Sequence, residues 1–141
     1  MHPLRALRER GNVTVAEAAE LLNDDIEFLT PVLLKSVKGK DLVSRIIARS
    51  SNVRHGKYLR EDKLDDHTTL LYWTGEVDGK PLETMEIITD DENGKIVHRV
   101  AAYRPWPAVA VFRQEMYNEM KNYLGPEYWS YTPEDPSTLP K

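Results

Sequence analysis

The chain has 141 residues, of which 40% are hydrophobic and 30% charged, and its formal net charge at pH 7 is −4. This length and composition predict a single domain with one core. The 23 acidic and 19 basic residues are interspersed along the chain, which disfavours nucleic acid as a partner.

Several other classes of protein are excluded at this stage. No apolar stretch approaches the roughly 20 residues needed to cross a bilayer, and residues 1–11 have no apolar signal core. We therefore expect no membrane partner and a cytoplasmic location. The chain has no cysteine, so disulfides and thiolate chemistry are excluded. The four histidines lack metal-binding spacings and no glycine-rich phosphate loop is present, so we expect neither a metal nor a cofactor.

Helices are expected at the start of the chain. Pro3 predicts a short helix as far as Arg10, closed by Gly11. Thr14 and Glu17 form a capping box, in which each side chain bonds the other residue's amide, so a second helix should run over residues 15–22.

A short strand over residues 26–29 should end at Thr30–Pro31, because proline removes a ladder donor, and residues 32–37 are a candidate return strand. After Gly39, apolar residues recur at helical spacing and predict a middle helix that ends near residues 50–52. Residues 54–57 form a basic patch that we interpret as a complement to the dipole of this helix.

The following segment alternates with a period of two and predicts an antiparallel meander. Its strands should cover residues 55–62, 68–77, 81–89 and 96–103. Asp78–Gly79 is a strong two-residue hairpin turn, and residues 90–94 form a looser loop. A closing helix should then reach Gly125, so we expect one domain over residues 1–125 and an extended, proline-rich tail over residues 126–141.

This order of elements resembles the SnoaL-like branch of the NTF2-like superfamily. The local motifs that carry the resemblance are LNDDIEFLTP at 22–31, VKGKDL at 37–42, DENGKI at 91–96 and RPW at 104–106. The resemblance implies an α+β, cone-shaped fold in which a curved antiparallel sheet packs on the N-terminal and middle helices and a C-terminal helix closes the cone. It also implies a pocket for a small hydrophobic molecule and a homodimer formed through the outer sheet face. The superfamily includes isomerases, cyclases, dehydratases and binding domains, so the fold alone does not choose a function.

The position of the best-known catalytic base in this superfamily is occupied by Thr30. In the ketosteroid isomerases, the base is an aspartate just before the proline that ends the early strand. Threonine is not a base near neutral pH, and no tyrosine precedes Tyr58 to supply the first-helix oxyanion hole. Steroid-isomerase chemistry of that kind is therefore disfavoured.

The hairpin register suggests another acid–base pair. A two-residue turn at Asp78–Gly79 places Leu71 opposite Glu86, and if Thr89 pairs with Lys95, Glu86 faces His98. A carboxylate beside an imidazole in an apolar pocket is suited to proton transfer, so Glu86 and His98 are candidate catalytic residues. The alternative is an ordinary cross-strand ion pair. The candidate pocket residues are Leu71, Trp73, Thr84, Val100, Phe28 and Thr30.

Both faces of the predicted sheet are largely apolar. Helices can cover one face, and a second copy of the chain would then cover the other, which is the main argument for a homodimer. The sequence leaves open which face lines the pocket. It also leaves two functions open: a pocket protein that binds or transforms a small hydrophobic metabolite by cofactor-free acid–base chemistry, and a non-catalytic homodimeric ligand-binding or assembly domain.

Overall fold

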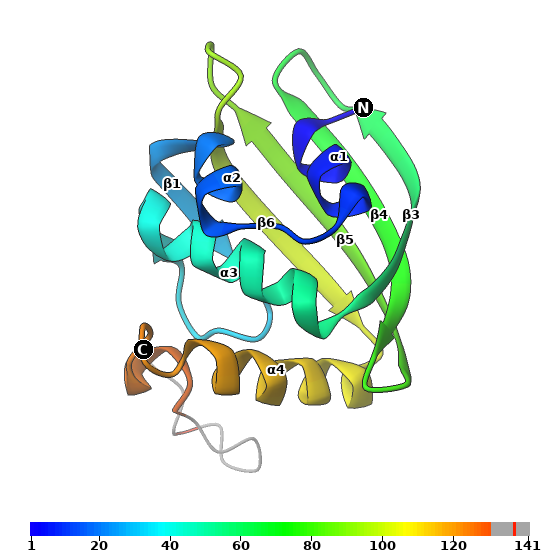
Figure 1. Ribbon diagram of the computed structural model, residues 1–141, viewed down its shortest axis with the longest axis vertical. Helices are drawn as coiled ribbons and strands as arrows, with labels where there is room; N and C mark the ends of the chain where they lie inside the picture. Colours follow the sequence, from blue (N-terminus) through cyan, green and yellow to red (C-terminus); the bar gives the residue numbers. More distant parts are fainter. Residues whose placement is uncertain (131–136, 138–141) are drawn as a thin grey trace.

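The computed structural model describes residues 1–130 and 137 and contains four helices and six strands (Figure 1). The helices are α1 (Pro3–Arg10), α2 (Val15–Glu20), α3 (Lys40–Val53) and α4 (Trp106–Met120). The strands are β1 (Leu22–Leu29), β2 (Val37–Lys38), β3 (His55–Lys63), β4 (Thr68–Val77), β5 (Lys80–Asp90) and β6 (Ile96–Arg104). A short 3₁₀ turn follows at Pro126–Tyr128. Most of the predicted tail, residues 131–136 and 138–141, lies outside the described residues.

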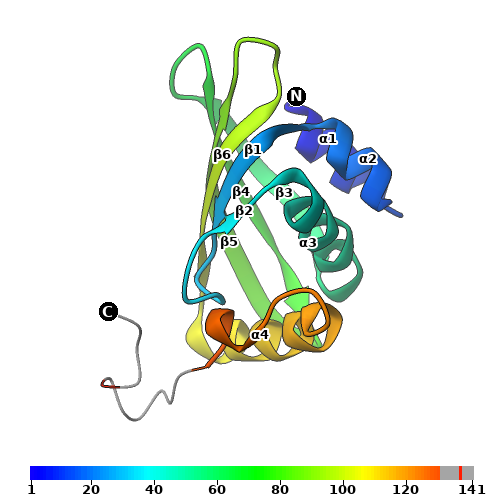
Figure 2. The same cartoon turned by 90° about the vertical axis from the view of Figure 1, so that its left-hand side faces the viewer.

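The strands form one curved sheet in the order β2-β1-β6-β5-β4-β3. Figure 2 shows α1, α2 and α3 on one side of this sheet, with α4 across one end. The predicted α+β fold class is therefore confirmed. One detail of the prediction is wrong, because β1 and β6 pair in parallel and the sheet is mixed. The expected return strand over residues 32–37 is reduced to β2, which pairs with β1 over two residues.

Local sequence accounts for several element boundaries. The capping box is present: the amide of Glu17 donates to Thr14 Oγ1 at 3.1 Å, and the amide of Thr14 donates to Glu17 Oε2 at 3.5 Å. In the β4–β5 turn, Asp78 and Gly79 have φ angles of 48° and 74°, the left-handed conformation that such two-residue turns require. The register of β4 and β5 is as predicted, with Leu71 opposite Glu86 and Trp73 opposite Thr84.

The predicted register of β5 and β6 is wrong. Glu86 lies opposite Ala101 rather than His98, and the pairing shifts between Thr89 and Asp90, where the strands contain an irregularity. The offset is an odd number of residues, so most of β6 presents the opposite side chains from those predicted. Arg99 and Ala101 therefore face the interior, while His98 and Val100 face outward.

The core lies between the helices and the inner face of the sheet. Its fully buried side chains come from every layer and include Leu4, Phe28, Ile47, Leu71, Ile88 and Phe112. Trp129, beyond the 3₁₀ turn, also joins this core and is only 5% exposed. Among residues 1–130 and 137, no helix combines the length and the apolar character needed to cross a bilayer.

Candidate functional site

A buried ion pair lies on the inner face of the sheet, where β5 and β6 bring Glu86 and Arg99 together. Arg99 Nε donates to Glu86 Oε2 at 2.5 Å, and the side chains are 2% and 3% exposed, respectively. The Arg99 guanidinium also lies 4.4 Å from the ring centroid of Phe28. Burial alone would raise the pKa of Glu86, but the attraction of Arg99, followed by Arg8 and Arg54, outweighs it and leaves this pKa below its ordinary value. Glu86 is therefore held ionised.

Two further arginines act on this pair from the helical side. Arg8 comes from α1 and Arg54 follows the last residue of α3. Arg8 Nη2 donates to Ser50 Oγ at 3.1 Å, which joins α1 to α3. The Arg54 guanidinium lies 4.6 Å from the ring centroid of Trp73. The interior thus holds three arginines around one glutamate.

A small cavity, which we call the interior cavity, lies between the sheet, α3 and α4. Its volume is about 20 Å³, enough for about one water molecule. Thr30 Oγ1 and Arg99 Nη1 are buried without a hydrogen-bond partner in the described part of the chain. The lining residues are Phe28, Thr30, Val32, Leu33, Ile46, Ser50, Arg99, Tyr103, Phe112, Met116, Met120, Leu124 and Trp129.

The segment after α4 covers this cavity. Trp129 Nε1 donates to the carbonyl of Leu124 at 3.2 Å, and Arg113 donates to the carbonyl of Trp129. The amide of Leu34 donates to the carbonyl of Tyr128 at 2.9 Å, which fastens the segment to the loop after β1. The indole of Trp129 is thus a wall of the cavity.

A larger cavity, which we call the arginine pocket, opens where the end of α1 meets the end of α3 and the start of β3. Its volume is about 240 Å³. Gly56 and Gly75 leave room for the indole of Trp73, because a Cβ at either position would lie within 2.6 Å of that ring. The residues that line the arginine pocket are Arg8, Gly11, Ser51, Arg54, His55, Gly56 and Trp73.

The predicted pairing of Glu86 with His98 is wrong. His98 is on the outer face, where its side chain is 43% exposed and its Nε2 lies 3.7 Å from Glu27 Oε1. Glu86 is on the inner face and bonds Arg99. Because the sheet separates the two groups, the proposed acid–base pair is not assembled.

The predicted pocket residues divide into four groups. Phe28 and Thr30 line the interior cavity, and Trp73 lines the arginine pocket. Leu71 and Thr84 are buried on the inner face but line neither cavity. Val100 was placed wrongly, because the changed register turns it to the outer face, where it is 36% exposed.

Sequence reasoning missed Arg8, Arg99 and the interior role of Arg54. Arg54 was interpreted as a complement to a helix dipole, and the predicted register placed Arg99 on the sheet face opposite to that of Glu86. Had the irregularity at Thr89 been known, the alternation of side chains along β6 would have placed Arg99 on the same face as Glu86. Within residues 1–130 and 137, no three histidine, aspartate or glutamate side chains are grouped so as to hold a metal ion.

Comparisons with known proteins agree with this architecture. No family model matches the chain, and no curated protein matches it in sequence. An uncharacterized protein with a cystatin-like fold from Silicibacter pomeroyi superposes with a TM-score of 0.78 at 22% identity, over 87% of this chain and 89% of that one. A steroid delta-isomerase from Pseudomonas aeruginosa superposes with a TM-score of 0.75 at 24% identity, over 84% and 86%.

A third solved structure belongs to the branch that the sequence motifs resemble. It is a SnoaL-like protein of unknown function from Burkholderia thailandensis, with a TM-score of 0.59 at 12% identity, covering 73% of this chain and 91% of that one. At such identities the likeness establishes the fold and leaves the activity open. The chain therefore has the cone-shaped, cystatin-like fold of the NTF2-like and SnoaL-like proteins, as its sequence motifs predict.

Proposed function

We propose that the chain is a non-catalytic, homodimeric binding domain that holds a small, mostly apolar molecule in the interior cavity. The observation that carries this proposal is the pair of buried, unpartnered donors, Thr30 Oγ1 and Arg99 Nη1, in an otherwise largely apolar lining. A ligand oxygen, such as a carbonyl, would accept hydrogen bonds from both. Because Glu86 already balances the charge of Arg99, the site favours a neutral ligand.

The geometry does not favour acid–base catalysis. Thr30 stands where the resemblance places the isomerase base. Glu86 bonds Arg99 and has a lowered pKa, which makes it a weak proton acceptor, and it does not line the interior cavity. The activity named for the Pseudomonas aeruginosa structure is therefore not transferred to this chain.

The size of the interior cavity sets a condition on binding. A volume of about 20 Å³ admits about one water, so a larger ligand must displace side chains from the lining. Trp129 is the largest of these side chains, and the hydrogen bond from the Leu34 amide to the Tyr128 carbonyl joins its segment to the sheet side. We infer that ligand entry moves the indole of Trp129.

The test is a thermal-shift screen of small apolar ketones and alcohols on the full chain, repeated on Thr30→Val. Without ligand, the variant should be at least as stable as the wild type, because an unpartnered buried hydroxyl is removed at nearly constant volume. Compounds that stabilise the wild type should bind the variant about fivefold to tenfold more weakly, since one hydrogen bond is lost.

Thr74→Val is the matched control, because Thr74 is half-buried on the outer face of β4. This variant should bind the same compounds as the wild type. Binding measured by calorimetry must confirm each compound. Equal affinity for the wild type and Thr30→Val, or an absence of stabilising compounds, would contradict binding in the interior cavity.

The outer sheet face supports the dimeric part of the proposal. It presents exposed apolar side chains at Met85, Ile87 and Val100. Beside them runs a shallow groove of about 550 Å³, lined by Arg60, Asp62, Leu64, Leu70, Tyr72 and Met85. An apolar face with both signs of charge at its edge is suited to two-fold association with a second copy.

Ile87→Lys is expected to convert the dimer to a monomer, because it places a charge in the centre of the apolar face, where pairing would bury it. Light scattering after size-exclusion chromatography measures the change directly. Ala110→Lys, at an exposed position of α4, adds the same charge away from the sheet and should leave the dimer intact. A monomeric wild type at high protein concentration would refute the dimer.

A further inference from the structure

The arginine pocket differs from the interior cavity in its balance of charge. Arg99 has Glu86 as its partner, but Arg8 and Arg54 have no carboxylate oxygen within 4.0 Å among residues 1–130 and 137. Three arginines and one glutamate therefore leave two positive charges without a local counter-charge. Unpaired charge inside a protein is costly and calls for an anion.

The hydrogen bonding of Arg8 is also incomplete, and Arg54 is held in place beside it. Arg8 Nη2 donates to Ser50, but its Nε is buried without a partner in the described part of the chain. Arg54 is only 6% exposed, and its guanidinium is held against the indole of Trp73. Both side chains are thus held in position, and Arg8 has a buried donor without a partner among the described residues.

Electrostatics within the cluster agree with this geometry. Burial of the guanidinium, followed by repulsion from Arg54, lowers the pKa of Arg8 to about 10. Arg8 thus carries its charge at a cost that a nearby anion would reduce. The opening beside it, about 240 Å³, has room for such a group.

We propose that the arginine pocket binds the oxyanion head group, a carboxylate or a phosphate, of a small organic molecule. Guanidinium groups match the paired oxygens of both head groups. His55 and Ser51 line the pocket as further polar groups, and the indole of Trp73 gives it an apolar wall. This site goes beyond the function proposed above, because it is lined by different residues and takes an anion rather than a neutral molecule.

The test uses benzoate, phenyl phosphate and inorganic phosphate as probes on the full chain at constant ionic strength, with benzamide as a neutral comparison. Calorimetry and thermal shift should show binding of at least one anion and none of benzamide. Binding of phenyl phosphate over inorganic phosphate identifies an organic phosphate as the preferred class, the reverse order indicates recognition of the head group alone, and binding of benzoate identifies a carboxylate.

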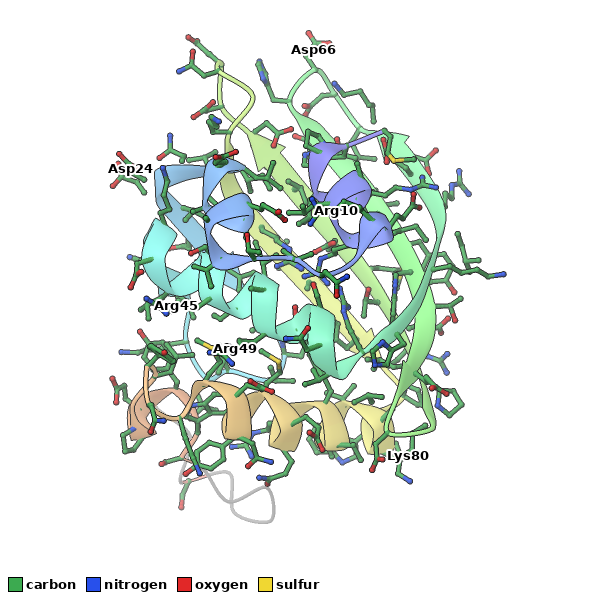
Figure 3. All side chains as sticks on the ribbon, in the orientation of Figure 1. Arg10, Asp24, Arg45, Arg49, Asp66 and Lys80 are labelled. Carbon is green, nitrogen blue, oxygen red and sulfur yellow. The ribbon has the colours of Figure 1, made fainter. Side chains whose placement is uncertain are left out.

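Arg8→Gln should weaken the binding of that anion by about tenfold or more, because one charge-assisted contact is lost. Arg54→Gln is a second variant with the same expectation. Arg10→Gln is the matched control: this exposed arginine of α1, labelled in Figure 3, pairs with Glu17 and does not line the pocket. Thr30→Val should also keep full anion affinity, which separates this test from that of the interior cavity.

The melting temperature of Arg8→Gln separates an anion site from a purely structural cluster. The anion site predicts the following result. Arg8→Gln removes a repelling cation, so its melting temperature without ligand should equal or exceed that of the wild type, while the anion-dependent rise is lost. A wild type that none of the three anions stabilises overturns the proposal, and an Arg8→Gln variant that also melts lower than the wild type would assign the cluster a purely structural role. Unchanged anion affinity in both arginine variants overturns the proposal as well.

Discussion

Replacing Glu86 by glutamine is expected to lower the free energy of unfolding by about 3–5 kcal/mol, the cost of removing one partner from a buried ion pair. The expected loss is large because Glu86 is the counter-charge of Arg99 and is also attracted by Arg8 and Arg54. Glutamine keeps the size of the side chain but leaves Arg99 without its counter-charge, so that, among the described residues, the core holds three positive charges and no negative one. Urea unfolding followed by circular dichroism measures the change.

Glu83→Gln is the control for this experiment. Glu83 lies on the same strand and bonds Tyr72 and Arg104, but on the outer face in contact with solvent. Surface ion pairs contribute little to stability. Glu83→Gln should therefore lower the free energy of unfolding much less than Glu86→Gln does. If the two variants lost the same free energy of unfolding, the buried ion pair would contribute no more to stability than the surface one.

The pH dependence of stability gives a second measurement on Glu86→Gln. In the folded wild type, the pKa of Glu86 lies below its ordinary value of 4.5. The contribution of the ionised carboxylate is therefore fully present above pH 4.5 and is lost as the pH falls through the lowered, folded value. Wild-type stability should decrease over this acid range, and the decrease should be smaller in Glu86→Gln.

Trp129→Ala is expected to destabilise the chain by about 3–5 kcal/mol, the usual cost of truncating a buried tryptophan. The indole is 5% exposed, packs edge-to-face with Tyr117 at 5.4 Å and walls the interior cavity. Its removal enlarges that cavity. Indole added to the variant should therefore raise its melting temperature, while the wild type should show no such rise.

Trp106→Ala is the matched control, because this tryptophan begins α4 but is 58% exposed. The free energy of unfolding of Trp106→Ala should differ from that of the wild type by less than about 0.5 kcal/mol, as for most surface substitutions. Added indole should not change the melting temperature of this variant. If Trp129→Ala behaved in the same way, the segment after α4 would not close the interior cavity, and the proposed route of ligand entry would fail.

The sequence predicted the parts of the fold that depend on local chemistry. The capping box at Thr14 and the turn at Asp78–Gly79 each specify a backbone conformation through the residues involved, and both were placed correctly. The β5–β6 loop has no such constraint. Its five residues allow several registers, and the irregularity at Thr89 reversed the parity of β6. The candidate acid–base pair failed with that one assignment.

The charged site could not be predicted for a related reason. Arg8 and Arg54 are 46 positions apart in the sequence, and their approach depends on how α1 packs beside the end of α3. Each arginine, considered alone, is an ordinary residue near a helix end. The two arginines form one site only through tertiary contacts, and the periodicity of a local sequence gives no information about such contacts.

The parallel pairing of β1 with β6 has a consequence for the order in which the chain can fold. β1 is completed at Leu29, yet its main partner begins at Ile96, after the whole β3–β5 meander has been synthesised. The hairpins of the meander close over short sequence distances and can form early, whereas the β1–β6 contact must close a long loop. Until then, β1 lacks its main partner strand, whereas α1 can already pack on β3, where the Arg5 guanidinium lies 5.7 Å from the ring centroid of Tyr58. During synthesis on a ribosome, β1 can therefore join the sheet through its main partner only after β6 has emerged.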